Sequence, residues 1–152
     1  MTATIDARTD RSLVITRLFD APRSLVFKAW TEPEHLVHWF GPKDFEATSL
    51  KFDVRKGGAY RCTIRSPGED HTMIGIYTEV KPPERLAFTF AWEGEDGKPG
   101  HPMHIEIDFA EEAGRTRMTF RHVGFETAKS RDDHNGGWTS CFDRLQDYVA
   151  AQ

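Results

Sequence analysis

The feature of this sequence that most restricts its fold is a period of two in hydrophobicity between Phe45 and Val123. Within it, Met103, Ile105 and Ile107 alternate with polar residues, and turn signals such as Gly57–Gly58 recur roughly every 10 to 15 residues. This alternation is typical of antiparallel strands with one buried face and one exposed face. We predict six strands in this region, and Leu13–Asp20 supplies a seventh.

Two short helices are predicted between the first strand and the other six. Pro22 suits the first position of a helix, and the apolar residues that follow it recur at helical spacing. Pro33 starts a second helix over Glu34–Trp39, which Gly41–Pro42 ends. The order strand, two helices, six strands and a final helix indicates an α+β fold.

The C-terminal stretch Asp132–Gln152 is predicted to be an amphipathic helix from Trp138 onward. On a helical wheel its apolar residues share one face: Trp138, Cys141, Phe142, Leu145, Tyr148 and Val149. Gly137 flanks this face, so it is expected to make room either against the sheet or for a ligand over the pocket mouth. Gly136 faces away and is expected to mark a bend or a loosened first turn. One helix cannot cover so wide a sheet, which predicts a cavity between them.

The bulk composition excludes several classes of partner. A formal net charge of −4 gives no general attraction to nucleic acid or anionic lipid. No apolar run approaches the roughly 20 residues of a membrane span, so no membrane insertion is expected. No secretory signal is visible and only two cysteines occur, which favours a cytoplasmic location. One domain over residues 12–152 is predicted, after a flexible segment at residues 1–11.

Four segments carry a resemblance to a known family. The chain is similar to the bacterial proteins grouped with the activator of heat-shock protein 90 ATPase (its C-terminal domain), within the START-like, or SRPBCC, helix-grip superfamily that also contains the birch-pollen allergen. The resemblance implies a curved antiparallel sheet of about seven strands wrapped around the last helix, with a hydrophobic pocket between them. The segments are ITRLFDAPRSLVFKAWTEPEHLVHWFGP (Ile15–Pro42), FDVRKGGAYR (Phe52–Arg61), VKPPERLAFTF (Val80–Phe90) and GWTSCFDRLQDYV (Gly137–Val149).

Histidines are the candidates for chemistry in such a pocket. His122 continues the buried parity of its strand, and His134 lies near Trp138 on the wheel, so both are weak candidates for an acid–base pair. The alternative is that His122 is bonded to protein backbone and His134 is exposed. His71 borders a loop and is expected at the surface. His35 and His38 lack a third ligand at a recognised spacing, so no metal site is predicted.

The predicted pocket lining combines aromatic walls with small or polar residues from the sheet and the last helix. The cysteines are expected to act as small buried hydrophobes, because neither has a basic partner. Outward arginines at positions 61, 65, 117 and 121 could form a basic stripe, but nearby carboxylates favour cross-strand pairing. The candidate ligand-binding residues are Trp30, Trp39, Phe40, Tyr60, Cys62, Phe90, Trp92, His122, His134, Gly137, Trp138 and Cys141.

These patterns favour the binding of a small hydrophobic or amphipathic molecule over catalysis, and no motif predicts a cofactor. Two alternatives remain open. The chain could be a protein-interaction module that acts on a chaperone, although it has no N-terminal partner domain like that of the eukaryotic activators. It could also be a cyclase, aromatase or hydrolase that uses His122 and His134. An exposed strand edge is compatible with a monomer or a homodimer.

Overall fold

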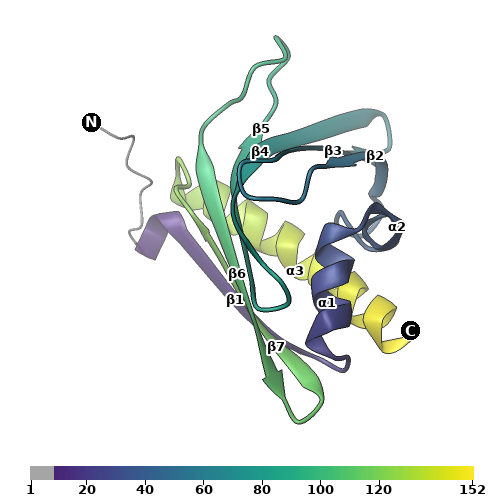
Figure 1. The fold of residues 1–152 in the computed structure, drawn as a ribbon. Coiled ribbons are helices and arrows are strands. Elements are labelled where there is room, and N and C mark those ends of the chain that lie inside the picture. Colours follow the sequence, from purple (N-terminus) through teal and green to yellow (C-terminus); the bar gives the residue numbers. More distant parts are fainter. Residues whose placement is uncertain (1–8) are drawn as a thin grey trace.

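The computed structural model describes residues 9–152 and contains one antiparallel sheet with three helices longer than a single 3₁₀ turn (Figure 1). Residues 1–8 of the predicted flexible segment lie outside the described part, and Thr9–Arg11 form a short 3₁₀ helix, η1. The strands are β1 (Ser12–Phe19), β2 (Glu46–Phe52), β3 (Ala59–Ser66), β4 (Glu69–Lys81), β5 (Arg85–Trp92), β6 (Met103–Glu112) and β7 (Arg115–Val123).

The strands are arranged in the order β1-β7-β6-β5-β4-β3-β2, so strands 2 to 7 form a meander and β1 returns to pair with β7. Every pairing is antiparallel. The sheet curves around a long helix, α3 (Ala128–Ala150), with α1 (Arg23–Thr31) and α2 (Pro33–Leu36) beside it (Figure 1). The predicted α+β helix-grip architecture is confirmed.

The alternation in β6 shows why these residues form a strand with one dry face. Ile105 and Ile107 are fully buried against the helices, whereas Glu106 and Asp108 lie on the outer face, where both carboxylates contact Arg85. The outward arginines are also paired with carboxylates across the surface, as predicted by the carboxylates near them in the sequence. Their partners are Glu93 for Arg61, Asp70 for Arg65, Glu112 for Arg117 and Glu106 for Arg121.

Helix α3 begins earlier than predicted because Thr127 caps it. The Thr127 side chain accepts a hydrogen bond of 3.0 Å from the backbone N–H of Ser130, which satisfies one of the free donors at a helix start. About two helical turns therefore precede Gly136, and the predicted loosened first turn is wrong. The predicted buried face is confirmed by Trp138, Cys141, Phe142, Leu145 and Val149.

The two short helices cover the part of the sheet that α3 leaves open. Trp30 from α1 is buried against Trp39 and Phe40, which follow α2. The second helix ends at Leu36, before the predicted end at Trp39, and the chain continues as turns. The gap that one helix would leave is thus largely filled by aromatic side chains.

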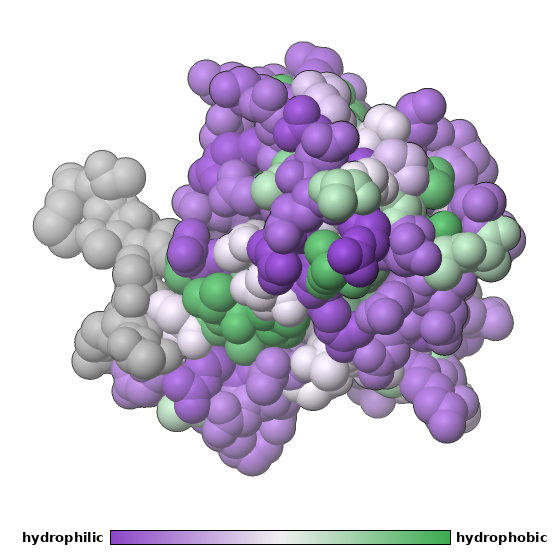
Figure 2. Space-filling view, turned by 90° about the horizontal axis from the view of Figure 1, so that it is seen from below, coloured by the Kyte–Doolittle hydropathy of each residue, from purple (hydrophilic) through white to green (hydrophobic). Residues whose placement is uncertain are grey.

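On the face that Figure 2 shows, most of the surface is hydrophilic, with hydrophobic areas between polar residues. No helix in residues 9–152 is long and apolar enough to cross a membrane.

Candidate functional site

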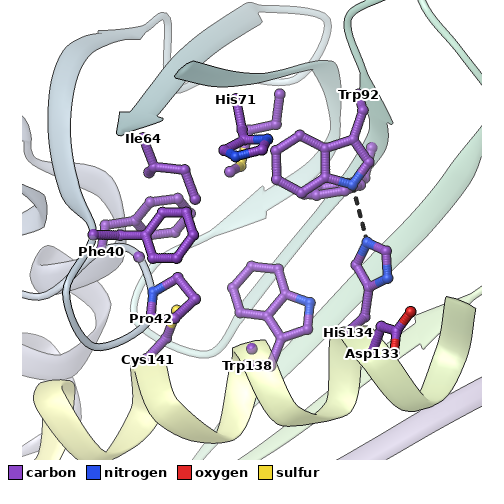
Figure 3. A pocket seen from close by; sticks show the side chains of 14 residues that line it. Phe40, Pro42, Ile64, His71, Trp92, Asp133, His134, Trp138 and Cys141 are labelled. Atoms are coloured by element: carbon purple, nitrogen blue, oxygen red, sulfur yellow. Dashed lines mark hydrogen bonds between the residues drawn. The ribbon is translucent and has the colours of Figure 1, made fainter. Parts of the chain in front are cut away.

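A cavity of about 250 Å³ lies between α3 and the inner face of the sheet (Figure 3). Trp138, His134 and Cys141 rise from α3, and His71 and Trp92 face them from the sheet. The connection between α2 and β2 closes one side. The full lining is Phe40, Gly41, Pro42, Phe45, Ile64, His71, Met73, Phe90, Trp92, Asp133, His134, Gly137, Trp138 and Cys141.

The structure brings most of the predicted residues to this cavity or to a smaller one next to it. Seven line the main cavity: Phe40, Phe90, Trp92, His134, Gly137, Trp138 and Cys141. Trp30, Tyr60 and Cys62 line an inner cavity of about 20 Å³, which shares Phe40, Phe90 and Trp138 with the main one.

Two predicted residues, Trp39 and His122, line neither cavity, contrary to expectation. Trp39 is fully buried and its indole N–H donates to the backbone oxygen of Ala29 at 3.0 Å. His122 points to the dry face as its parity predicted, but aromatic rings enclose it. Both side chains pack in the core behind the cavity wall.

His71, which was expected at the surface, lies in the cavity wall. Its side chain keeps 35% of its area exposed, and its ring contacts Phe45 and Trp92. The alternation of the strand indicates this position, since His71 lies two residues before Met73 on β4 and therefore on the same face. It also lies opposite Ile64 on β3. The other missed lining residues are Gly41, Pro42, Phe45, Ile64, Met73 and Asp133.

Arg144 holds the cavity wall formed by the α2–β2 connection. Its guanidinium donates to the backbone oxygens of Gly41, Pro42 and Phe45 at 2.8, 3.2 and 3.1 Å, and to that of His38 at 3.4 Å. A guanidinium has five donors in a rigid fork, which suits several converging acceptors. A single side chain on the polar flank of α3 therefore fixes a wall that lies about a hundred residues away in sequence.

His134 is held at the cavity edge with both ring nitrogens engaged. Its Nε2 accepts a hydrogen bond of 2.9 Å from the indole N–H of Trp92 (Figure 3), and its Nδ1 lies 2.8 Å from the backbone oxygen of Ser130. Nδ1 therefore carries the proton and the ring is neutral in this arrangement. Burial lowers the pKa of His134, and the bond to Ser130 opposes this only in part.

His122 forms a second indole–imidazole pair deeper in the core. The Trp138 indole N–H donates to Nδ1 of His122 at 3.1 Å, while Nε2 of His122 has no hydrogen-bond partner among the described residues. Burial, reinforced by His134 and His104 nearby, lowers the pKa of His122 well below its usual value. The two imidazoles therefore serve as neutral acceptors for two tryptophans, and neither offers a free basic nitrogen to the cavity.

The thiols are equally unsuited to nucleophilic chemistry. Burial raises the pKa of Cys62 and of Cys141 to about 12, so both stay protonated at neutral pH. This agrees with the prediction that they act as small apolar residues.

Charge is scarce at the cavity. The ionisable side chains that line it, apart from the Cys141 thiol, are His71, Asp133 and His134, and no lysine or arginine lines it. Within residues 9–152, no group of three or more histidine, cysteine or acidic side chains could hold a metal ion. The cavity thus offers aromatic and aliphatic contact, with polar groups at its rim.

Solved structures from several bacteria share this fold. A protein from Staphylococcus epidermidis is 27% identical, with 98% of this chain and 94% of that chain covered and a TM-score of 0.81. A protein from Nitrosomonas europaea is 25% identical, with 95% of this chain and 97% of that chain covered and a TM-score of 0.79. The AHSA1 protein of Silicibacter pomeroyi is 24% identical, with 92% of this chain and 98% of that chain covered and a TM-score of 0.82. This likeness shows the fold alone.

No curated protein matches the sequence. Residues 20–150 match the protein family described as "Activator of Hsp90 ATPase homolog 1-like protein". This range contains α1, both cavities and all of α3. Sequence and architecture agree with the resemblance noted above, and the chain therefore belongs to the Activator of Hsp90 ATPase homolog 1-like protein family.

Proposed function

We propose that this protein binds a small, uncharged apolar or aromatic molecule in the cavity between α3 and the sheet. The observation that supports this is the lining itself, which is almost wholly apolar and contains no lysine or arginine to pair with an acid. Pockets lined by aromatic residues with a few polar groups are typical of ligand sites. The free indole faces of Trp92 and Trp138 favour aromatic ligands, because rings pack edge-to-face or offset-stacked.

The cavity volume limits the size of this ligand. About 250 Å³ lies just below the 300–1,000 Å³ typical of sites for drug-sized molecules. A fused two-ring aromatic molecule suits this space better than a long acyl chain. We therefore regard neutral bicyclic aromatics as the first class to test.

Gly137 gives the test of this site, and Gly136 gives its matched control. A Cβ at Gly137 would lie 3.7 Å from Cγ of Pro42, across the cavity mouth, whereas a Cβ at Gly136 would meet open space. We expect Gly137→Leu to weaken binding of 2-naphthol at least tenfold, and Gly136→Leu to leave it unchanged. Isothermal titration calorimetry at neutral pH measures both, with a negative heat-capacity change expected for wild type.

Both substitutions remove a helix glycine, so each is expected to raise stability by roughly 0.5–1 kcal/mol. Loss of folding therefore does not explain a difference between them. Absence of saturable binding to wild type across neutral bicyclic aromatics would rule out the proposed ligand class. Equal weakening by the two variants would show that the ligand does not pass the Gly137 mouth.

Family membership supports a second candidate, activation of a chaperone ATPase. The test is the ATPase rate of a bacterial heat-shock protein 90 homologue with and without this protein. Stimulation that persists in Gly137→Leu would assign the activity to the protein surface and separate it from ligand binding. An unchanged rate at saturating protein would exclude this function.

Acid–base catalysis by His122 and His134 has no comparable support. It needs two imidazole nitrogens facing the same ligand, whereas His122 is enclosed and His134 uses both nitrogens in hydrogen bonds.

A further inference from the structure

The outer face of the sheet carries a hollow of its own, on the side away from α3. Its volume is about 700 Å³, within the range of ligand sites. Ile74, Ile76 and Ala91 form part of its apolar surface, and the β5–β6 connection contributes Pro99 and Pro102. Figure 1 shows this connection extending beyond the end of the sheet. We call this hollow the outer pocket.

An interruption of the sheet lies beneath the outer pocket. The β4–β5 register runs through Ile74↔Ala91 and resumes at Tyr77↔Phe88, without Cα partners for the two β4 residues between. The backbone N–H of Ile76 donates to the Thr89 hydroxyl at 2.8 Å, and the Tyr60 hydroxyl donates to the Thr89 carbonyl at 2.7 Å.

Gly75 permits this arrangement. A Cβ there would lie 2.0 Å from the Thr89 oxygen and 2.6 Å from the Tyr60 ring, distances that no side chain could accommodate. At Gly75 the strand therefore carries no side chain, and only backbone contributes to the pocket at this position. Next to Gly75, Ile76 keeps 49% of its area exposed, which is large for an isoleucine in a sheet.

The rim of the outer pocket is cationic. Lys51 on β2 lies directly opposite Arg61 on β3, and like charges in such a pair destabilise each other. Glu93 pairs with Arg61 at 2.7 Å, whereas Lys51 has no ion-pair partner in the described part of the chain. An anion beside Lys51 would relieve this repulsion. This feature has no counterpart in the inner cavity, which no lysine or arginine lines.

We infer that the outer pocket is a second binding site, for an amphipathic anion that places an apolar ring or short chain on Ile74, Ile76 and Ala91 and its acid group beside Lys51. The site rests on the outer pocket alone and does not depend on the function proposed for the inner cavity. The two sites differ in charge preference, since one accepts neutral molecules and the other accepts acids.

The anionic fluorophore 8-anilinonaphthalene-1-sulfonate is a suitable probe. We expect saturable binding to the folded protein, weakened at least fivefold by Lys51→Glu and by Ile76→Ser. Lys56→Glu is the matched control, because Lys56 is exposed in the β2–β3 turn and outside the pocket. This control and Gly137→Leu should bind the probe as wild type does. Binding should also weaken with added salt, as expected for an exposed charge contact.

Lys51→Glu replaces a like-charged pair with an opposite one, so the variant is expected to fold. Equal effects of Lys51→Glu and Lys56→Glu would overturn the inference, because only net charge would then matter. Loss of probe binding in Gly137→Leu alone would place the probe in the inner cavity. A dimer that dissociates in Ile76→Ser, measured by sedimentation, would show that a second copy of the chain covers this surface instead.

Discussion

Replacing Arg144 with alanine is expected to lower the free energy of unfolding by about 2–4 kcal/mol and to weaken ligand binding in the inner cavity. Its guanidinium is the donor for the backbone oxygens of Gly41, Pro42 and Phe45. Hydrogen bonds to a charged group each contribute about 1.5–3 kcal/mol, although contributions that share one side chain do not add fully. Urea denaturation with calorimetric titration of 2-naphthol measures both effects.

Arg144→Lys distinguishes geometry from charge. Lysine keeps the positive charge on α3 but replaces the planar fork with a single ammonium. We therefore expect Arg144→Lys to recover only a small part of the lost stability and to keep the weakened binding. Full recovery by lysine would show that charge alone holds the α2–β2 connection. A wild-type affinity in Arg144→Ala would show that this wall does not need the clamp.

The contrast between Arg144 and Ile105 shows which parts of the structure were predictable. The strand containing Ile105 follows from local alternation, because successive side chains of a strand point to opposite faces. The buried face of α3 follows in the same way from the helical period. Each of these predictions needs only neighbouring residues. Arg144 looks like any solvated arginine on a helix, and its role depends on carbonyl groups about a hundred positions earlier.

Site residues on strands and on α3 could be predicted from the hydrophobic period of their element. Site residues in the connection between elements could not, because their position depends on the path of the chain. Phe90, Trp92 and Trp138 followed from their periods. Pro42 and Phe45 did not, because the α2–β2 connection has no period that points its side chains inward. The prediction for His71 was wrong for a different reason. Strand β4 begins at Glu69, so the histidine lies within a strand and not in the loop before it.

The interruption at Gly75 was also beyond prediction from sequence. A glycine inside a strand signals a bulge or a close approach of backbone, but the approaching groups come from two other strands. Tyr60 on β3 and Thr89 on β5 meet there only when the strand order is known. Both inferred sites thus depend on contacts that only the folded chain creates.

The second large effect concerns pH and the buried imidazole of His122. We expect the free energy of unfolding to fall as the pH drops below about 6.5, the usual pKa of histidine. Burial lowers the pKa of His122 in the folded chain, so the unfolded chain takes up a proton that the folded chain refuses. The contribution of the neutral imidazole to stability is then fully present above this pH. Below it, the free energy of unfolding falls by about 1.4 kcal/mol per pH unit for each such proton.

Substitutions at both partners of the indole–imidazole pair test this assignment. His122→Asn and His122→Leu should each remove one proton's share of the slope, measured by urea denaturation between pH 5 and pH 7.5. Leucine should in addition lower stability at pH 7.5 by roughly 1–3 kcal/mol relative to wild type, because it leaves the buried Trp138 indole N–H without an acceptor.

Trp138→Phe is the control that separates the proton from the hydrogen bond. It removes the donor but keeps His122 buried among Phe90, Phe120 and Phe125, so the pH slope should persist while stability falls at every pH. A wild-type slope in His122→Leu would contradict the assignment and move the proton uptake to His134, whose pKa burial also lowers. Loss of the slope in Trp138→Phe would instead show that the indole bond, and not burial, keeps the imidazole neutral.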